Sequence, residues 1–362
     1  MDIEFNLWLL CGGLSIGLLL GIIIQRSKFC MAAAVSNLVL MRDYRQLHAY
    51  IAALAIAVAG TQLLELTGLV TLNETGYLAT QINWLGAILG GVTFGVGTVL
   101  AGGCVGRTLI RVGEGNIGSF IVLIAIGITA AITMYGALEP FRIDIRQSLP
   151  LNISSDSSSL ASILDLPSLL ISISLVSVCF VIIYNSWKQS QNRTLLVAGS
   201  LIGLLVVLGW WVTGYLSQDI FSLHRPASLS FAGPLANVTY IISTGNTLGD
   251  GATFGLTLLI GTIVGSTISA ISSKSFFWIL PEPHHITHLI IGGTLMGFGA
   301  VIAGGCNIGH GLTGVSTCSF KSIITVASIV AGMRIGVCLL MYTESWGKDS
   351  RLGLFLQHIR RH

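Results

Sequence analysis

Long apolar stretches alternate with short polar ones along almost the whole chain. Stretches of spanning length run approximately over residues 5–25, 47–70, 82–101, 115–138, 167–187, 194–216, 250–271, 286–305 and 319–342. About 20 apolar residues in a helix cross the hydrocarbon core of a bilayer. The pattern therefore predicts an all-α polytopic membrane protein with about nine transmembrane helices.

Four further apolar pieces are too short to cross a membrane. They are residues 29–41, the stretch after Cys104, residues 227–243 and the stretch after Cys306. Non-helical backbone at membrane depth is tolerated only where it is buried in protein or lines a cavity. We therefore expect four short re-entrant or loop helices inside the bundle.

Two glycine-rich stretches within the spans follow one pattern. Residues 90–104 and 292–306 both read Gly-Gly-x3-Gly-x-Gly-x3-Ala-Gly-Gly-Cys, so Gly292 matches Gly90 and Cys306 matches Cys104 at an offset of 202 residues. The shared register indicates an internal duplication. The two stretches lie in the third and eighth predicted spans, so they should point in opposite directions. Such inverted repeats characterise many secondary transporters.

The duplication divides the chain into two halves and a connector. We expect a first repeat with spans 1–4 in residues 1–140 and a second repeat with spans 6–9 in residues 194–345. Between them, residues 141–193 would form an external loop and the connecting fifth span, and residues 346–362 a cytoplasmic tail. The stretch 139–165 is rich in serine, which predicts an external loop.

Composition and charge agree with a membrane protein and give it an orientation. The mean hydropathy is +0.83 and 9% of the residues are charged, against about 25% in soluble domains. The net charge of +3 is too small to indicate a nucleic-acid partner. One side of the predicted bundle collects Arg26, Lys28, Arg42, Arg45, Arg107, Arg111, Lys188, Arg193, Lys274, Lys348, Arg351, Arg360 and Arg361. The other side has only Arg142, Arg146, Arg225 and Lys321, so the positive-inside rule places the N-terminus outside and the C-terminus in the cytoplasm.

Three cysteines lie where helices are expected to break. Gly102 and Gly103 precede Cys104, Gly304 and Gly305 precede Cys306, and Cys30 opens the short piece after the first span. Backbone N–H groups at helix starts offer partial positive charge to an anion. These three cysteines and four glycines are therefore the candidate substrate path. The remaining cysteines, Cys11, Cys179, Cys318 and Cys338, are expected to be small buried apolar residues.

Polar residues near these turns are candidates for anion attraction. Arg26 and Arg111 flank the first two cysteines, and Asn307 and His310 follow the third, where they could face a cavity. Arg334 lies inside the last span and needs a partner, for which Glu114 or a loop carbonyl is a candidate. His284, His285 and His288 have metal-compatible spacing without an obvious fourth ligand, so no metal is expected. The chain has no nucleotide-binding or hydrolase motif, so neither a cofactor nor a catalytic residue is expected.

The cysteine motifs resemble those of the YeeE/YedE family of sulfur-transport membrane proteins, and most closely its YeeE thiosulfate transporters. The strings are Gln-Arg-Ser-Lys-Phe-Cys at 25–30, Ala-Gly-Gly-Cys at 101–104 with Arg-Val-Gly-Glu-Gly at 111–115, and Met-Gly-Phe-Gly-Ala-Val-Ile-Ala-Gly-Gly-Cys-Asn-Ile-Gly-His-Gly at 296–311. The resemblance implies a bacterial inner-membrane importer of thiosulfate for cysteine synthesis, with an hourglass-shaped fold. It also implies that Cys30, Cys104 and Cys306 line the passage, and that a small TusA-like sulfurtransferase of the YeeD type works beside the protein in the cytoplasm.

Two alternatives remain open at this point. One is a transporter of another sulfur or selenium anion. The other is a membrane sulfurtransferase, in which a thiolate at Cys104 or Cys306 attacks a sulfane sulfur and holds a persulfide. Burial in apolar surroundings favours protonated thiols, so we prefer a relay of neutral S–H groups to thiolate chemistry.

Overall fold

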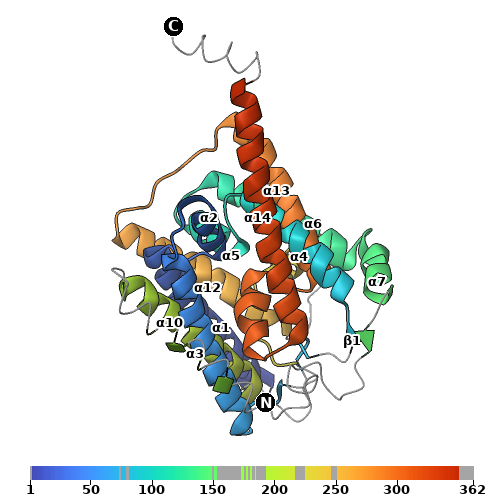
Figure 1. The fold of residues 1–362 in the computed structure, drawn as a ribbon. Helices are drawn as coiled ribbons and strands as arrows, with labels where there is room; N and C mark the ends of the chain where they lie inside the picture. Colours follow the sequence, from blue (N-terminus) through green and yellow to red (C-terminus); the bar gives the residue numbers. More distant parts are fainter. Residues whose placement is uncertain are drawn as a thin grey trace.

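The computed structural model is a bundle of long helices packed side by side (Figure 1). It describes residues 2–72, 75–78, 81–148, 151–152, 173–174, 177, 180–181, 184, 193–216, 225–245 and 251–349. The long helices are α1 (Asp2–Ser27), α3 (Arg45–Leu66), α4 (Trp84–Leu100), α6 (Ile117–Tyr135), α10 (Arg193–Trp211), α12 (Gly251–Ser272), α13 (Pro283–Ala303) and α14 (Phe320–Asp349). In the described chain, 8 stretches are long and apolar enough to span a membrane. An all-α polytopic membrane protein is therefore confirmed, and the expected fifth span at 167–187 falls mostly outside the described residues.

Short helices occupy the four places where the apolar pieces are too short to span. They are α2 (Met31–Met41), α5 (Val105–Gly113), α11 (Ala232–Thr244) and the π-helical turn η3 (Gly309–Gly314). In Figure 1, α2 and α5 lie towards the end of the bundle to which α14 extends. Other short elements in the described residues are helix α7 (Glu139–Gln147), η2 (Val212–Leu216), which continues α10, and the antiparallel strands β1 (Gln81–Ile82) and β2 (Leu151–Asn152).

Glycines end the two glycine-rich spans just before a cysteine. Gly102 follows α4 with a φ of 71°, and Gly304 follows α13 with a φ of 88°. Residues with a Cβ rarely adopt this left-handed conformation, which is why glycine commonly ends helices. The N–H groups of Gly304 and Gly305 both donate to the carbonyl of Ala300, at 3.0 and 2.8 Å. The chain thus leaves each long helix in a tight turn and can start a short helix at the cysteine.

An additional helix differs from the sequence-based expectation. Residues 139–165 were expected to form an external loop, but the stretch begins with helix α7 (Glu139–Gln147). Local signals explain this helix, since Pro140 stands in the first turn with Glu139, and Arg146 stands in the last turn. The hydropathy pattern missed α7 because the helix is short and polar. It carries two basic residues, Arg142 and Arg146.

The two glycine-rich spans cross each other antiparallel. A Cβ built on Gly90 would lie 2.7 Å from the Gly299 carbonyl oxygen, and one built on Gly97 would lie 2.7 Å from the Gly292 carbonyl oxygen. Residue numbers therefore rise along α4 as they fall along α13, which confirms the opposite directions expected from the sequence. Small residues allow this close backbone approach in membrane bundles.

Helix pairings recur in the register of the duplicated sequence. Helix α1 packs along α12, and the corresponding helices α10 and α3 also pack together. Helix α4 packs along α14, and the corresponding helices α13 and α6 do the same. A duplicated unit folded twice predicts such matched pairings, which place the two cysteine turns at equivalent points of the two halves.

Candidate functional site

Cys30 and Cys104 lie against each other at the starts of two short helices. Cys30 is the N-cap residue of α2 and Cys104 that of α5, and both have extended backbone conformations. Neither side chain caps its own helix, so both thiols are free to face the interior. Their sulfur atoms are 3.8 Å apart and buried. The basic residues that flank these two cysteines, Arg26, Lys28, Arg107 and Arg111, were all expected on one side of the bundle, and the contact between the two sulfurs agrees with that expectation.

Cys306 occupies the equivalent turn after α13. Its side chain is 0% exposed, and the backbone N–H of Gly309 donates to its sulfur at a distance of 3.5 Å. The sulfur thus lies against the first turn of the short helix that follows, where the Gly309 N–H group points towards it. None of the three sulfur-bearing side chains faces out of the bundle, because Cys30 and Cys104 are also buried.

Tyr50 lies near the cysteine turns and was not among the site residues expected from the sequence. Its ring stacks on Phe29, with ring centroids 6.1 Å apart, and Phe29 directly precedes Cys30. The same phenol lies within electrostatic range of both Cys104 and Cys306. Its hydroxyl is buried and has no hydrogen-bond partner in the described part of the chain. A buried unpaired hydroxyl costs about 1–3 kcal/mol. That cost is removed when a solute accepts the hydrogen bond.

A second phenol, also missed from the sequence, lies beside Cys306. The Tyr77 side chain is within electrostatic range of Cys306 and meets the ring of His310 edge-on, with centroids 5.5 Å apart. Tyr50 lies in a predicted span, where its hydroxyl needs a partner, so its sequence carried a usable signal. Tyr77 lies between the predicted spans 47–70 and 82–101 and carried none. The sequence does not show which distant residues surround a tyrosine, so neither Tyr50 nor Tyr77 could be assigned to the cysteine turns from the sequence.

The two polar residues predicted after Cys306 have different roles. The Asn307 side chain interacts with the Cys104 thiol, while its Oδ1 atom is buried without a hydrogen-bond partner among the described residues. Asn307 therefore links the turn of Cys306 to the other cysteine pair. His310 is held in place, since Nε2 lies 3.2 Å from the Ala303 carbonyl oxygen, to which it donates, and Nδ1 lies 3.0 Å from the Ser322 hydroxyl.

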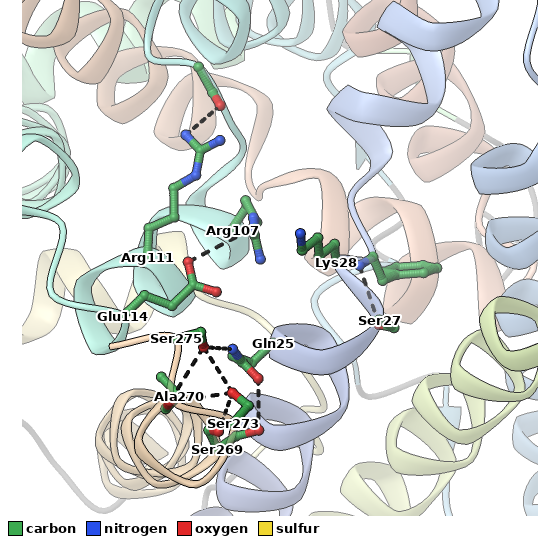
Figure 2. A network of polar contacts seen from close by, with 12 residues as sticks. Gln25, Ser27, Lys28, Arg107, Arg111, Glu114, Ser269, Ala270, Ser273 and Ser275 are labelled. Carbon is green, nitrogen blue, oxygen red and sulfur yellow. Dashed lines mark hydrogen bonds and ion pairs between the residues drawn. The ribbon is translucent and has the colours of Figure 1, made fainter. Parts of the chain in front are cut away.

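A cavity of about 320 Å³ opens beside the first cysteine pair. We call it the Cys30 cavity, and its walls include Lys28, Cys30, Gly103, Arg107 and Arg111. Figure 2 shows its cationic side chains around one space. Arg111 donates to the Gly102 carbonyl at 2.8 Å, and Arg107 lies 3.7 Å from Glu114. The cavity is therefore cationic, which suits an anion.

The nearby polar network fixes the helix ends that frame this cavity. Gln25 at the end of α1 donates to Ser275 at 3.1 Å and accepts from Ser269 at 2.8 Å (Figure 2). Arg26 lines a neighbouring cavity of about 540 Å³ between α1 and α10, which shares Lys28 and Gln46 with the Cys30 cavity. Of the two arginines predicted to attract an anion, Arg26 and Arg111, only Arg111 lines the Cys30 cavity among the described residues. Arg107 also lines this cavity, although the sequence gave it no role.

A second cavity lies beside the turn that leads to Cys306. We call it the Gly304 cavity. It measures about 260 Å³, and its walls include Gly304, Gly305, Lys321, Arg142 and Arg146. Both glycine pairs that were predicted from the sequence therefore border a cavity, Gly102 and Gly103 on the Cys30 cavity and Gly304 and Gly305 on this one.

Several other expectations are corrected by the structure. Cys318 is buried, but Cys11 and Cys338 are exposed on the outer surface of the bundle, and Cys179 lies outside the described residues. An apolar thiol is tolerated there because lipid is as apolar as a protein core.

Glu114, a candidate partner for Arg334, pairs with Arg107 instead. Arg334 is exposed on α14.

Comparison with known proteins gives the chain a family. The family described as sulphur transport matches residues 26–335. The thiosulfate transporter TsuA of Escherichia coli (strain K12) is 29% identical over 358 residues, which cover 93% of this chain and 94% of that protein. The thiosulfate transporter TsuA of Spirochaeta thermophila is 30% identical over 337 residues, covering 88% of this chain and 96% of that protein. The chain therefore belongs to the sulphur-transport family of membrane proteins, the YeeE/YedE family that its cysteine motifs indicated.

Proposed function

We propose that this protein is a transporter, not an enzyme, and that it carries thiosulfate across the bacterial inner membrane into the cytoplasm. The anion passes Cys306 first and then Cys104 and Cys30. One observation supports the path most directly: three buried cysteines open short helices beside two cavities. Tyr50 lies within electrostatic range of Cys104 and Cys306, and Asn307 interacts with Cys104. The names of the two relatives support thiosulfate as the substrate.

The chemistry of thiosulfate suits this arrangement. It is a dianion with one soft terminal sulfur, to which an S–H group donates weakly. The starts of α2 and α5 add partial positive charge at Cys30 and Cys104. Several weak contacts favour passage over trapping, because a transported solute must bind well enough to enter and loosely enough to leave.

The repeat explains how one chain can build such a path. We propose that residues 1–140 and 194–345 form an inverted repeat around the path, connected by residues 141–193, and that residues 346–362 form a cytoplasmic tail. The matched helix pairings and the antiparallel crossing of α4 and α13 support this division. On the cytoplasmic side, a TusA-like sulfurtransferase is the proposed acceptor of the sulfur. The cations of the Cys30 cavity, Lys28, Arg107 and Arg111, would deliver the anion towards it.

Growth on a single sulfur source tests the function. A bacterium that lacks its own thiosulfate and sulfate uptake should grow on thiosulfate alone only when it expresses this chain. Growth on cysteine, with and without the chain, is the control for toxicity. No growth on thiosulfate despite protein in the membrane would contradict the substrate. Growth on sulfite instead, or uptake of a labelled selenium anion, would identify another transported anion.

The orientation can be tested independently of transport. The excess of Lys and Arg on one side predicts an N-terminus outside and a C-terminus in the cytoplasm. A reporter fused after His362 should therefore give a cytoplasmic signal, and one fused at Asp2 a periplasmic signal. The reverse labelling would contradict both the orientation and the order in which the cysteines meet the anion.

Tyr50→Phe should lower uptake without lowering stability. The substitution keeps the ring on Phe29 and removes a hydroxyl that has no partner in the described chain, so the folded protein loses no internal hydrogen bond. If the hydroxyl donates to the passing anion, uptake at low concentration falls by about 10-fold, the value of one hydrogen bond to a charged group. Tyr215→Phe, at an exposed tyrosine, is the matched control. Equal uptake by both variants would remove Tyr50 from the path.

A further inference from the structure

The duplicated cysteine turns differ in how many thiols the sequence gives them. Cys30 and Cys104 open α2 and α5, and their sulfur atoms lie 3.8 Å apart. At the offset of 202 residues that relates Cys306 to Cys104, the counterpart of Cys30 is Ala232, the first residue of α11. A path of weak S–H donors needs only one thiol at each turn. The second thiol beside Cys104 therefore needs a separate explanation.

The positions of Cys30 and Cys104 suit a disulfide. The sulfur atoms of a disulfide are about 2 Å apart, so the two sulfurs must approach each other by less than about 2 Å. Neither side chain caps its own helix, so each can turn towards the other without losing a capping hydrogen bond. Both cysteines stand before the first helical residue, and Gly102 and Gly103 precede Cys104. The approach therefore does not require a helix to unwind.

The two thiols differ in their access to the Cys30 cavity. Cys30 lines this cavity of about 320 Å³, whereas Cys104 is not among the described residues that line it. A reagent in the cavity therefore meets the sulfur of Cys30 first. Cys104 lies close enough to react with the product, which is the arrangement of an attacking and a resolving thiol.

The charges of the cavity select the kind of oxidant. Lys28, Arg107 and Arg111 line it, no carboxylate is among its described lining residues, and Nη1 of Arg107 is buried without a hydrogen-bond partner in the described part of the chain. Glu114, at 3.7 Å from Arg107, offsets one of the three positive charges. A cationic cavity concentrates small dianions. Polythionates are dianions of this kind that also carry sulfur–sulfur bonds, which a thiol can reduce.

We propose that Cys30 and Cys104 form a redox-active dithiol, which reduces a polythionate and is itself oxidised to a disulfide that closes the path. With tetrathionate, the Cys30 sulfur loses its proton to water and attacks one of the two central sulfurs. The bond between the central sulfurs breaks, thiosulfate leaves, and the other half of the oxidant stays bonded to Cys30. The Cys104 sulfur then loses its proton and attacks the Cys30 sulfur, which expels a second thiosulfate. Two thiols and one tetrathionate thus give one disulfide, two thiosulfate ions and two protons.

The disulfide changes the path in two ways. It removes both S–H donors at this end, and it ties the starts of α2 and α5 together. Closure of the path rests on the proposed transport function, whereas formation of the disulfide does not. A thiol reductant restores both thiols by exchange. The pair therefore responds to the oxidised dimer of the anion that the protein is proposed to carry.

Peptide mapping of the purified full chain tests the dithiol. After treatment with tetrathionate, alkylation of the remaining thiols in denaturant and proteolysis without reductant, the peptides of Cys30 and Cys104 should be joined. The peptide of Cys306 should be joined to neither. In Cys104→Ser, Cys30 should keep half of the oxidant as a stable adduct, and in Cys30→Ser, Cys104 should stay free. A single, unshifted elution peak in detergent shows that each variant is folded.

Uptake into proteoliposomes tests the closure. Treatment with tetrathionate, followed by its removal, should abolish thiosulfate uptake, and dithiothreitol should restore it. The double variant Cys11→Ala/Cys338→Ala lacks two exposed thiols and should be inhibited and restored like the wild type. Added salt should slow the formation of the disulfide by tetrathionate but not by the uncharged hydroxyethyl disulfide, because only the dianion is attracted by the cations of the cavity.

The outcomes separate this inference from the proposed function. Treated wild-type protein without joined peptides overturns the dithiol, even when thiosulfate uptake is normal. Joined peptides with undiminished uptake overturn the closure, and loss of inhibition in the Cys11 and Cys338 variant assigns it to the exposed thiols instead. Joined peptides in a protein that shows no uptake before treatment keep the dithiol and contradict the transport function.

Discussion

Cys306→Ala should abolish thiosulfate uptake or reduce it severely, while the protein still reaches the membrane. The thiol is fully buried at a helix start and accepts a hydrogen bond from the Gly309 N–H group. Alanine removes the S–H group that donates to the soft sulfur of the anion at this turn. The substitution deletes a single atom from a buried site, so the cost in stability should be about 1 kcal/mol and the fold should survive.

Cys104→Ala should have a similarly large effect. Its sulfur lies 3.8 Å from that of Cys30 and also interacts with Asn307, so its loss interrupts the path between the two turns. Cys338→Ala is the matched control, because this thiol is exposed on α14 and should leave uptake nearly unchanged. Initial rates of radiolabelled uptake, corrected for the amount of protein in the membrane, measure all three variants. Equal rates in the three would show that the cysteine turns are not the substrate path.

Features that depend on neighbouring residues in the sequence were predictable. The eight described spans, the four short helices and the antiparallel crossing of α4 and α13 follow from hydropathy, from spacing and from the register of the repeat. The adjacency of Cys30 and Cys104 also followed, because both cysteines end spans on the same predicted side of the membrane.

Features that depend on contacts between distant segments were not predictable. Tyr50 reaches two cysteine turns that are far from it in the sequence, and nothing in its local sequence indicates this. Glu114 pairs with Arg107, about two helical turns earlier, and not with the mid-span Arg334, for which the sequence made it a candidate partner. Arg142 and Arg146 were expected in an external loop, but they lie on helix α7 and line a cavity together with Lys321. In each case the missing information was which polar groups share one space.

The crossing of α4 and α13 should not tolerate a large side chain. A Cβ built on Gly299 would lie 2.5 Å from the Phe94 amide nitrogen, 2.7 Å from the Gly90 carbonyl oxygen and 2.9 Å from the Phe94 Cα. These atoms belong to the α4 backbone, which cannot rotate away as a side chain would. Gly299→Leu must therefore separate the two helices, at a cost of about 3 kcal/mol or more from overpacking.

This cost outweighs the local gain from removing a glycine, since leucine favours a helix over glycine by only about 1 kcal/mol. The variant should give little folded protein, and what is recovered should unfold at a clearly lower temperature in detergent. Gly233→Leu is the matched control, because a Cβ at Gly233 meets no atom within 4 Å. That variant should be recovered in normal yield with an unchanged unfolding temperature. Normal stability of Gly299→Leu would mean that α4 and α13 do not cross through backbone contact. The cysteine turns at the ends of these two helices would then lie in positions other than those described.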